Sequence, residues 1–260
     1  MVNGLAKFAE AFRPFQSQYV LIGGSACDWI GERVGAVFRQ TKDLDLVVCA
    51  ETVTPEFGAA FWRFVREGGY KPYFRSDGTR CLYRFVEPTS TSHPAMLELF
   101  SRAELPVPRD GATVAPLPLG DDVSDLSAIL LEPDYYGFIR SQRRDIDGVS
   151  TLGPEALIVL KAHAWMDLRR RHAAGQFVKE RDLRKHRQDV FRLLRIVVPG
   201  SQPLPLPASL FHDLEDFLVT MESEPYDLAH LGIRDPYPDV LARIRSRFVL
   251  EEGQDGEAPA

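Results

Sequence analysis

The chain has 260 residues, of which 45% are hydrophobic and 26% charged, and its formal net charge at neutral pH is −6. This is enough apolar material for one large or two ordinary globular domains, and no apolar run approaches the roughly 20 residues of a membrane helix. The first 13 residues carry no uninterrupted apolar segment of the kind found in secretory signals, so we expect a cytoplasmic protein whose three cysteines are reduced packing residues.

Local patterns in the N-terminal half predict a mixed sheet with helices packed on it. Leu5, Phe8, Ala9 and Phe12 keep the spacing of one helix face, and Pro14 follows them. Further along, glycine, proline and capping residues separate short apolar runs. The predicted helices cover residues 5–12, 26–35, 55–67 and 135–141. The predicted strands cover residues 19–22, 44–49, 70–75, 80–86, 96–100, 113–115, 127–131 and 146–152.

The pattern becomes helical after Gly153 and Pro154. Helices are predicted over residues 154–174, 179–198, 207–222 and 236–248, with a proline-rich linker at 199–207. We therefore predict that the chain has three parts: a sheet-containing domain over 1–152, a helical domain over 153–250, and a disordered acidic tail over 251–260. The predicted fold class is α+β.

Positive charge is concentrated in one segment of this acidic chain. Ten Lys or Arg and three acids lie between Arg169 and Arg195, a local charge of +7 that leaves −13 on the remainder. Such a segment could attract a polyphosphate or an RNA backbone, and a solvated helix face explains it equally well.

A glycine turn follows the first predicted strand. Gly23 and Gly24 would let backbone N–H groups approach a phosphate at a helix N-terminus, and Ser25 could add a hydroxyl. The alternative is a tight turn in which Ser25 caps the helix.

Alternating aspartates begin the next predicted strand. Asp43 and Asp45 lie on one face because strand side chains alternate, and two adjacent carboxylates repel unless a cation separates them. We therefore expect a divalent metal, Mg²⁺ or Mn²⁺, at Asp43, Asp45 and a third acid. Glu98, inside the apolar run 96–100, is the candidate, either as metal ligand or as the base that takes a proton from an attacking hydroxyl. The alternatives are an exposed strand end for the aspartates and a solvent-facing glutamate on an edge strand.

The helical half contains two further candidate residues. Lys161 lies on the apolar stripe of its predicted helix, where it requires an anion unless its side chain extends to solvent. Asp189 shares a helix face with Lys185, so an i, i+4 ion pair between them is the structural alternative to a functional role.

Two sequence segments resemble the AbiEii/AbiGii-type nucleotidyltransferases of bacterial abortive-infection and toxin–antitoxin systems. The first combines Leu-Ile-Gly-Gly-Ser-Ala at 21–26 with Thr-Lys-Asp-Leu-Asp-Leu at 41–46, and the second combines residues 152–168 with 185–193. The resemblance implies a DNA-polymerase-β-like nucleotidyltransferase domain with a helical C-terminal region, a nucleoside triphosphate (NTP) and magnesium. It also implies that Lys161 faces phosphate or base and that Asp189 helps to close the site. Family members often carry aspartate where this chain has Glu98.

The predicted function is transfer of a nucleoside monophosphate from an NTP to an acceptor hydroxyl. Asp43, Asp45, Glu98, Lys161 and Asp189 are the candidate catalytic residues. The candidate nucleotide-binding residues are Gly23, Gly24, Ser25, Lys161 and Lys185. The basic segment favours RNA, for example the 3′ end of a tRNA, as acceptor, and kinship suggests a toxin with a separate antitoxin protein. The alternatives are a small hydroxylated acceptor such as an antibiotic, and a non-catalytic nucleotide-binding module.

Overall fold

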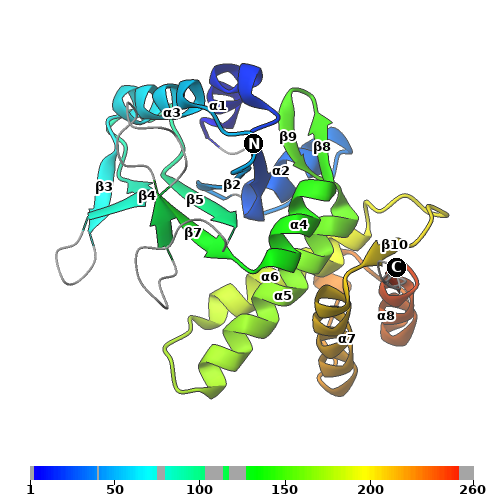
Figure 1. The fold of residues 1–260 in the computed structure, drawn as a ribbon. Helices are drawn as coiled ribbons and strands as arrows, with labels where there is room; N and C mark the ends of the chain where they lie inside the picture. The colour runs from blue at the N-terminus through cyan, green and yellow to red at the C-terminus, as the bar shows by residue number, and fades with distance from the viewer. Residues whose placement is uncertain (1–2, 40, 75–79, 103–113, 117–126, 252–260) are drawn as a thin grey trace, which may run out of the picture. The chain divides into compact units, whose positions relative to one another are not determined.

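The computed structural model describes residues 3–39, 41–74, 80–102, 114–116 and 127–251, which fall into two compact units (Figure 1). The first unit is Met1–Leu157 and the second is Ile158–Ala260, so the division falls inside one long helix, α5 (Pro154–Ala173). None of the helices in these ranges has the length and apolar character needed to cross a membrane. Apart from residue 251, the predicted tail lies outside the described residues.

The described part of the first unit is built on a mixed sheet of seven strands with the order β1-β2-β5-β4-β3, in which β7 also pairs with β5 and β6 with β7. Strand β2 runs antiparallel to β1 and parallel to β5. The strands are β1 (Tyr19–Ile22), β2 (Asp43–Val48), β3 (Lys71–Phe74), β4 (Arg80–Val86), β5 (Met96–Arg102), β6 (Val114–Pro116) and β7 (Ser127–Leu131). The accompanying helices are α1 (Leu5–Ala11), η1 (Arg13–Phe15), α2 (Gly23–Arg33), α3 (Pro55–Gly68) and α4 (Pro133–Ser141). The predicted mixed sheet with flanking helices is confirmed.

An aromatic core covers one face of this sheet. Phe8 and Phe12 of the N-terminal segment stack with ring centroids 4.3 Å apart, and the ring of Tyr19 on β1 meets that of Phe8 edge-on at 5.3 Å. Tyr19 is paired with Val48 in the sheet register, so Leu44 and Leu46 of β2, which alternate in step with Val48, point into the same core. The residues between them on β2 therefore point to the opposite face.

Helix α3 is well defined by its ends. The side chain of Thr54 accepts a hydrogen bond from the backbone N–H of Phe57, and Pro55 occupies the first helical position. At the other end Gly69 adopts a left-handed conformation, with φ of 63°. These local signals explain why the predicted and observed helices agree closely.

The strand predicted over residues 146–152 begins too early. Residues 143–152 form a hairpin in which β8 (Arg143–Ile146) runs antiparallel to β9 (Val149–Leu152), so only residues 149–152 form the second strand. The turn is Asp147-Gly148, with φ of 49° and 80°, the Asp-Gly combination that suits a tight hairpin turn. The hairpin is attached to β1 by hydrogen bonds from Ser150 Oγ to the Tyr19 carbonyl (2.6 Å) and from Thr151 Oγ1 to the Leu21 carbonyl (2.9 Å).

The second unit is helical, as predicted. It contains most of α5 together with α6 (Glu180–Leu194), α7 (Ala208–Ser223), η2 (Ala229–Leu231) and α8 (Tyr237–Arg245). Trp165 is buried in its core, with its ring edge-on to Phe217 at 5.3 Å. Residues 199–207 were predicted to be a proline-rich linker. They also contain a short strand, β10 (Leu204–Leu206), which pairs in parallel with β11 (Phe248–Leu250).

Candidate active site

Asp43 and Asp45 lie on β2 and point away from the aromatic core. Both aspartates are partly buried, whereas Leu44 and Leu46 are completely buried on the other face. This is the alternation predicted from the sequence. The aspartates are therefore neither core residues nor side chains on a freely exposed strand end.

The glycine turn lies directly against Asp45. Ile22 is the register partner of Asp45, and Gly23 follows with φ of 73°. A Cβ atom on Gly23 would come within 2.1 Å of Asp45 Oδ2, so only glycine allows this approach without displacing the carboxylate. The structure thus brings the predicted turn and one predicted aspartate into contact.

A cation that the sequence analysis missed also borders the turn. A Cβ atom on Gly24 would lie 3.2 Å from Arg39 Nη2 and 3.1 Å from Thr41 Oγ1. Arg39 belongs to the segment that leads into β2. Its position two residues before the Thr-Lys-Asp motif is the sequence feature that could have indicated a place near the site. A guanidinium at this place adds positive charge to the N-terminal end of α2.

Ser25 has a local hydrogen bond. It is completely buried, and its hydroxyl donates to the Ile22 carbonyl at 3.2 Å. The N-cap of α2 is Ile22, and no side chain caps the helix. The alternative in which Ser25 is the helix cap is therefore wrong, and its hydroxyl stabilises the turn from within the first helical turn.

Glu98 lies on β5, the strand next to β2. It is the register partner of Asp45, so its Cα lies about 4.8 Å away, the usual spacing of neighbouring strands. Strand β5 is interior to the sheet and Glu98 is only 8% exposed, so the alternative of a solvent-facing glutamate on an edge strand is wrong. The predicted carboxylates thus share one face of two adjacent strands.

Arg84 is the ion-pair partner of Glu98. The two residues are register partners across β4 and β5, and Arg84 Nε donates to Glu98 Oε1 at 2.6 Å, with a second contact from Nη2. Burial lowers the pKa of Arg84, but the Glu98 carboxylate raises it, and the net pKa lies above the ordinary value. The sequence signal was a lone cation in the run Cys-Leu-Tyr-Arg-Phe-Val, and it was missed.

Across the described residues, no group of three or more His, Cys, Asp or Glu side chains is arranged to hold a metal ion. Glu98 is close to Asp45 along the sheet but is paired with Arg84. The chemistry available on this face is therefore a pair of aspartates, an adjacent Glu98–Arg84 ion pair, and a glycine turn beside Arg39.

Lys161 and Asp189 form a buried ion pair in the second unit. Lys161 Nζ lies 3.0 Å from Asp189 Oδ2, and the two side chains are 4% and 1% exposed. Arg192 Nη1 lies 3.6 Å from the other oxygen of Asp189. The anion expected for Lys161 is thus a residue of this chain, and its extension to solvent is wrong.

Lys185 forms an ion pair with Asp182 rather than with Asp189. Its Nζ donates to Asp182 Oδ1 at 3.0 Å, one turn back along α6, so the structural alternative of a Lys185–Asp189 ion pair is wrong. The four-residue spacing was compatible with that pair, but Asp189 faces the core while Lys185 is partly exposed.

Comparison with known proteins gives no close relative. No protein-family model matches the chain, and no curated protein matches it. Among solved structures it is similar to the antibiotic-resistance factor ANT(2'')-Ia, with a TM-score of 0.37 and 15% identity over 88% of this chain and 94% of that one. It is also similar to the Megavirus polyadenylate synthase, with a TM-score of 0.39 and 11% identity, covering 84% of this chain but 37% of the other. Because both TM-scores are below 0.5, the activity has to be inferred from the residues of this chain.

Proposed function

We propose that the chain is a nucleotidyltransferase that moves a nucleoside monophosphate from an NTP to an acceptor hydroxyl and releases pyrophosphate. The observation that carries the proposal is the contact between the Gly23 turn and Asp45, whose register partner on the next strand is Glu98. A phosphate-binding turn and a carboxylate face are the two parts that phosphoryl transfer requires, because the reaction depends on positioning and on charge stabilisation.

The triphosphate is proposed to bind at the N-terminal end of α2. The first backbone N–H groups of a helix have no partner within the helix, and its dipole favours an anion there. Helix α2 has 11 residues and begins at Gly23, and Arg39 next to Gly24 supplies a guanidinium that can donate to phosphate oxygens. Ser25 is proposed to keep the shape of the turn rather than to contact phosphate.

Asp43 and Asp45 are proposed to hold Mg²⁺ or Mn²⁺. Two partly buried carboxylates on one strand face fit Mg²⁺, which is commonly held by one or two carboxylates and by substrate phosphates. The bound ion would neutralise charge on the triphosphate. Glu98 is proposed either to complete this site or to accept the proton of the acceptor hydroxyl, with Arg84 fixing the position of its carboxylate.

The acceptor is proposed to be RNA, such as the 3′ end of a tRNA, because of the basic segment between Arg169 and Arg195. Part of that charge is neutralised within the fold: Arg169 pairs with Glu224 and Arg170 with Asp213, each at 2.5 Å. This neutralisation favours a second candidate acceptor, a small hydroxylated molecule of the antibiotic type. The AbiEii-type toxin role and a separate antitoxin rest on the sequence resemblance alone.

The test is pyrophosphate release from each NTP with Mg²⁺, in the presence of total RNA or of a panel of hydroxylated small molecules. We expect label from the α-phosphate of one NTP to enter RNA. Asp43→Asn should reduce the rate at least 100-fold, as loss of a charge-stabilising group commonly does. Glu67→Gln, which removes an exposed carboxylate on α3 of the same unit, should leave the rate unchanged.

The outcomes separate the proposals. Label in a small molecule but not in RNA would replace the RNA acceptor with the second candidate. Tight binding of NTP and Mg²⁺ by calorimetry, with no pyrophosphate released against any acceptor, would show a non-catalytic binding module. Full turnover by Asp43→Asn would exclude the carboxylate mechanism.

A further inference from the structure

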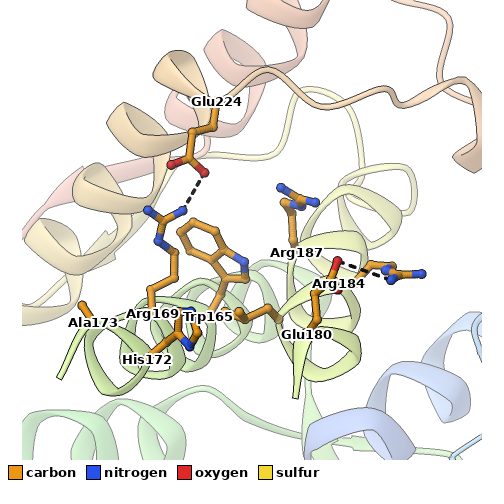
Figure 2. A pocket seen from close by; sticks show the side chains of 9 residues that line it. Trp165, Arg169, His172, Ala173, Glu180, Arg184, Arg187 and Glu224 are labelled. Carbon is orange, nitrogen blue, oxygen red and sulfur yellow. Dashed lines mark hydrogen bonds and ion pairs between the residues drawn. The ribbon is translucent and has the colours of Figure 1, made fainter. Parts of the chain in front are cut away.

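A pocket of about 390 Å³ lies in the second unit, between α5, α6 and the C-terminal end of α7 (Figure 2). Its volume falls in the range of small-ligand sites, roughly 300–1,000 Å³. Leu183 supplies an apolar surface beside Trp165, which lines the pocket but is only 2% exposed, and Arg169, Arg184 and Arg187 supply positive charge. The combination suits a ligand that has both an apolar or flat part and an anionic part.

The three arginines of the pocket differ in how well they are neutralised. Arg169 lies 2.5 Å from Glu224 and is therefore matched, as the dashed line in Figure 2 shows. Arg184 lies 3.6 Å from Glu180, but both side chains are largely exposed, and such pairs contribute little. Among the residues that the structure describes, no carboxylate forms an ion pair with Arg187.

Arg187 also carries a buried donor that lacks an acceptor. Its Nε is buried and has no hydrogen-bond partner among the described residues, although the side chain lines the pocket. Its guanidinium lies 3.9 Å from the ring centroid of Tyr226, and this contact restricts the plane of the group. A buried donor without an acceptor is costly. An anion in the pocket would be bound by the other donors of the Arg187 guanidinium, Nη1 and Nη2.

The arrangement of charge favours phosphate over carboxylate as the anion. Arg184 and Arg187 are three residues apart on α6, so their side chains are neighbours on the helix surface. A phosphate monoester carries close to two negative charges at neutral pH and several acceptor oxygens, which matches two guanidinium groups better than the single charge of a carboxylate.

We propose that this pocket binds a phosphate monoester attached to a flat ring, the chemistry of a nucleoside monophosphate. Arg187 and Arg184 donate to the phosphate, and the ring lies against Leu183. The site uses residues of the second unit only and requires no metal ion, so it does not rest on the proposed transfer reaction.

The test is isothermal titration calorimetry on the full chain in EDTA, with Asp43→Asn and Asp45→Asn introduced to disable the candidate metal site. We expect AMP to bind, inorganic phosphate to bind more weakly, and adenosine not to bind. Phenyl phosphate tests which kind of ring the pocket accepts. If phenyl phosphate and AMP bind with equal affinity, any flat ring suffices, and if AMP binds more tightly, the pocket is specific for nucleotides. Each of these two results supports the phosphate site.

Two variants locate the site. Arg187→Gln and Arg184→Gln should each weaken AMP binding at least tenfold, which corresponds to about 1.4 kcal/mol. Arg181→Gln makes the same charge change at an exposed position on the same helix, outside the pocket lining, and should leave affinity unchanged. Circular dichroism checks folding, and because Arg184 is 56% exposed its variant remains informative if Arg187→Gln does not fold. Adenosine binding as tightly as AMP, no AMP binding, or unchanged affinity in a folded Arg184→Gln or Arg187→Gln variant would overturn the proposal.

Discussion

The candidate aspartates of the two units lie in opposite environments. In the sheet unit, Asp43 and Asp45 are partly exposed on a strand face beside a glycine turn. In the helical unit, Asp189 is 1% exposed and lies 3.0 Å from Lys161, which is 4% exposed. Carboxylates that look alike as sequence motifs therefore differ physically: Asp43 and Asp45 are partly exposed, whereas Asp189 is neutralised inside the fold by Lys161.

This difference explains why the same kind of substitution should have different consequences in the two units. Removing a partly exposed carboxylate changes the chemistry of a face but leaves no buried charge behind. Removing one partner of a buried ion pair leaves the other partner charged in an apolar environment, which is costly. Activity and stability are thus expected to respond separately in the two regions.

The largest effect on stability is expected at the buried pair. Lys161→Met should lower the free energy of unfolding by about 3–5 kcal/mol because Asp189 keeps its charge without its closest cation. Combining it with Asp189→Leu should recover most of this loss, since replacing both charges by apolar groups is often neutral. Chemical denaturation followed by circular dichroism measures both variants.

The same Lys161 variants test the role implied by the sequence resemblance. If Lys161 contacts nucleotide phosphate, Lys161→Met should raise the KM for NTP, and the double variant should not restore it. A Lys161→Met protein of unchanged stability would contradict the structural role of the pair.

A smaller effect is expected at the glycine turn. Gly23→Ala places a Cβ atom 2.1 Å from Asp45 Oδ2 at a φ of 73°, so it should cost about 1–3 kcal/mol in strain and displace the carboxylate. The rate of pyrophosphate release should therefore fall along with stability. The measurement is a pair of unfolding and turnover assays on the same preparation.

Gly148→Ala in the hairpin turn is a matched control for Gly23→Ala. Gly148 has φ of 80°, but a Cβ atom there would meet nothing nearer than 3.8 Å, the side-chain amide of Gln16. It should cost about 1 kcal/mol from backbone strain alone and leave turnover intact. Equal activity losses in the two variants would show that the contact with Asp45 is not what matters.

The smallest effect concerns Glu51, just after β2. Burial raises the pKa of Glu51, but hydrogen bonds from Tyr136 (2.6 Å) and Arg140 (2.8 Å) outweigh it, so the net pKa lies below the ordinary value. Because the folded pKa is depressed, its stabilising contribution is present at pH above the unfolded value and is lost as the pH falls through the folded value. Glu51→Gln should therefore destabilise the protein by roughly 1 kcal/mol at pH 7 and much less at pH 3.

Unfolding curves of wild type and Glu51→Gln across this pH range measure the effect. Glu67→Gln is a suitable comparison, because Glu67 is an exposed acid of the same unit. A stability difference between wild type and Glu51→Gln that does not shrink toward low pH would contradict the assignment.

Several elements were predictable because their signals are local. The alternation of Asp43, Leu44 and Asp45 requires only the two-residue period of a strand, and Thr54-Pro55 with Gly69 marks both ends of α3. The hairpin at Asp147-Gly148 carried such a signal too, but the apolar residues on both sides resembled one strand. The β10–β11 pair had none, since two three-residue strands far apart in the chain show no usable periodicity.

The sequence by itself determined which residues share a strand face, where the glycine turn lies, and that Lys161 needs an anion. Only the tertiary structure decided that Arg84 pairs with Glu98, that Arg39 borders Gly24, and that Asp189 rather than a ligand lies next to Lys161. The reason is that periodicity and capping act over a few residues, whereas the partner of a charge depends on strand order and helix packing. Strand order and helix packing bring together residues that are far apart in the sequence, and the sequence separation of two residues does not reveal whether they are in contact.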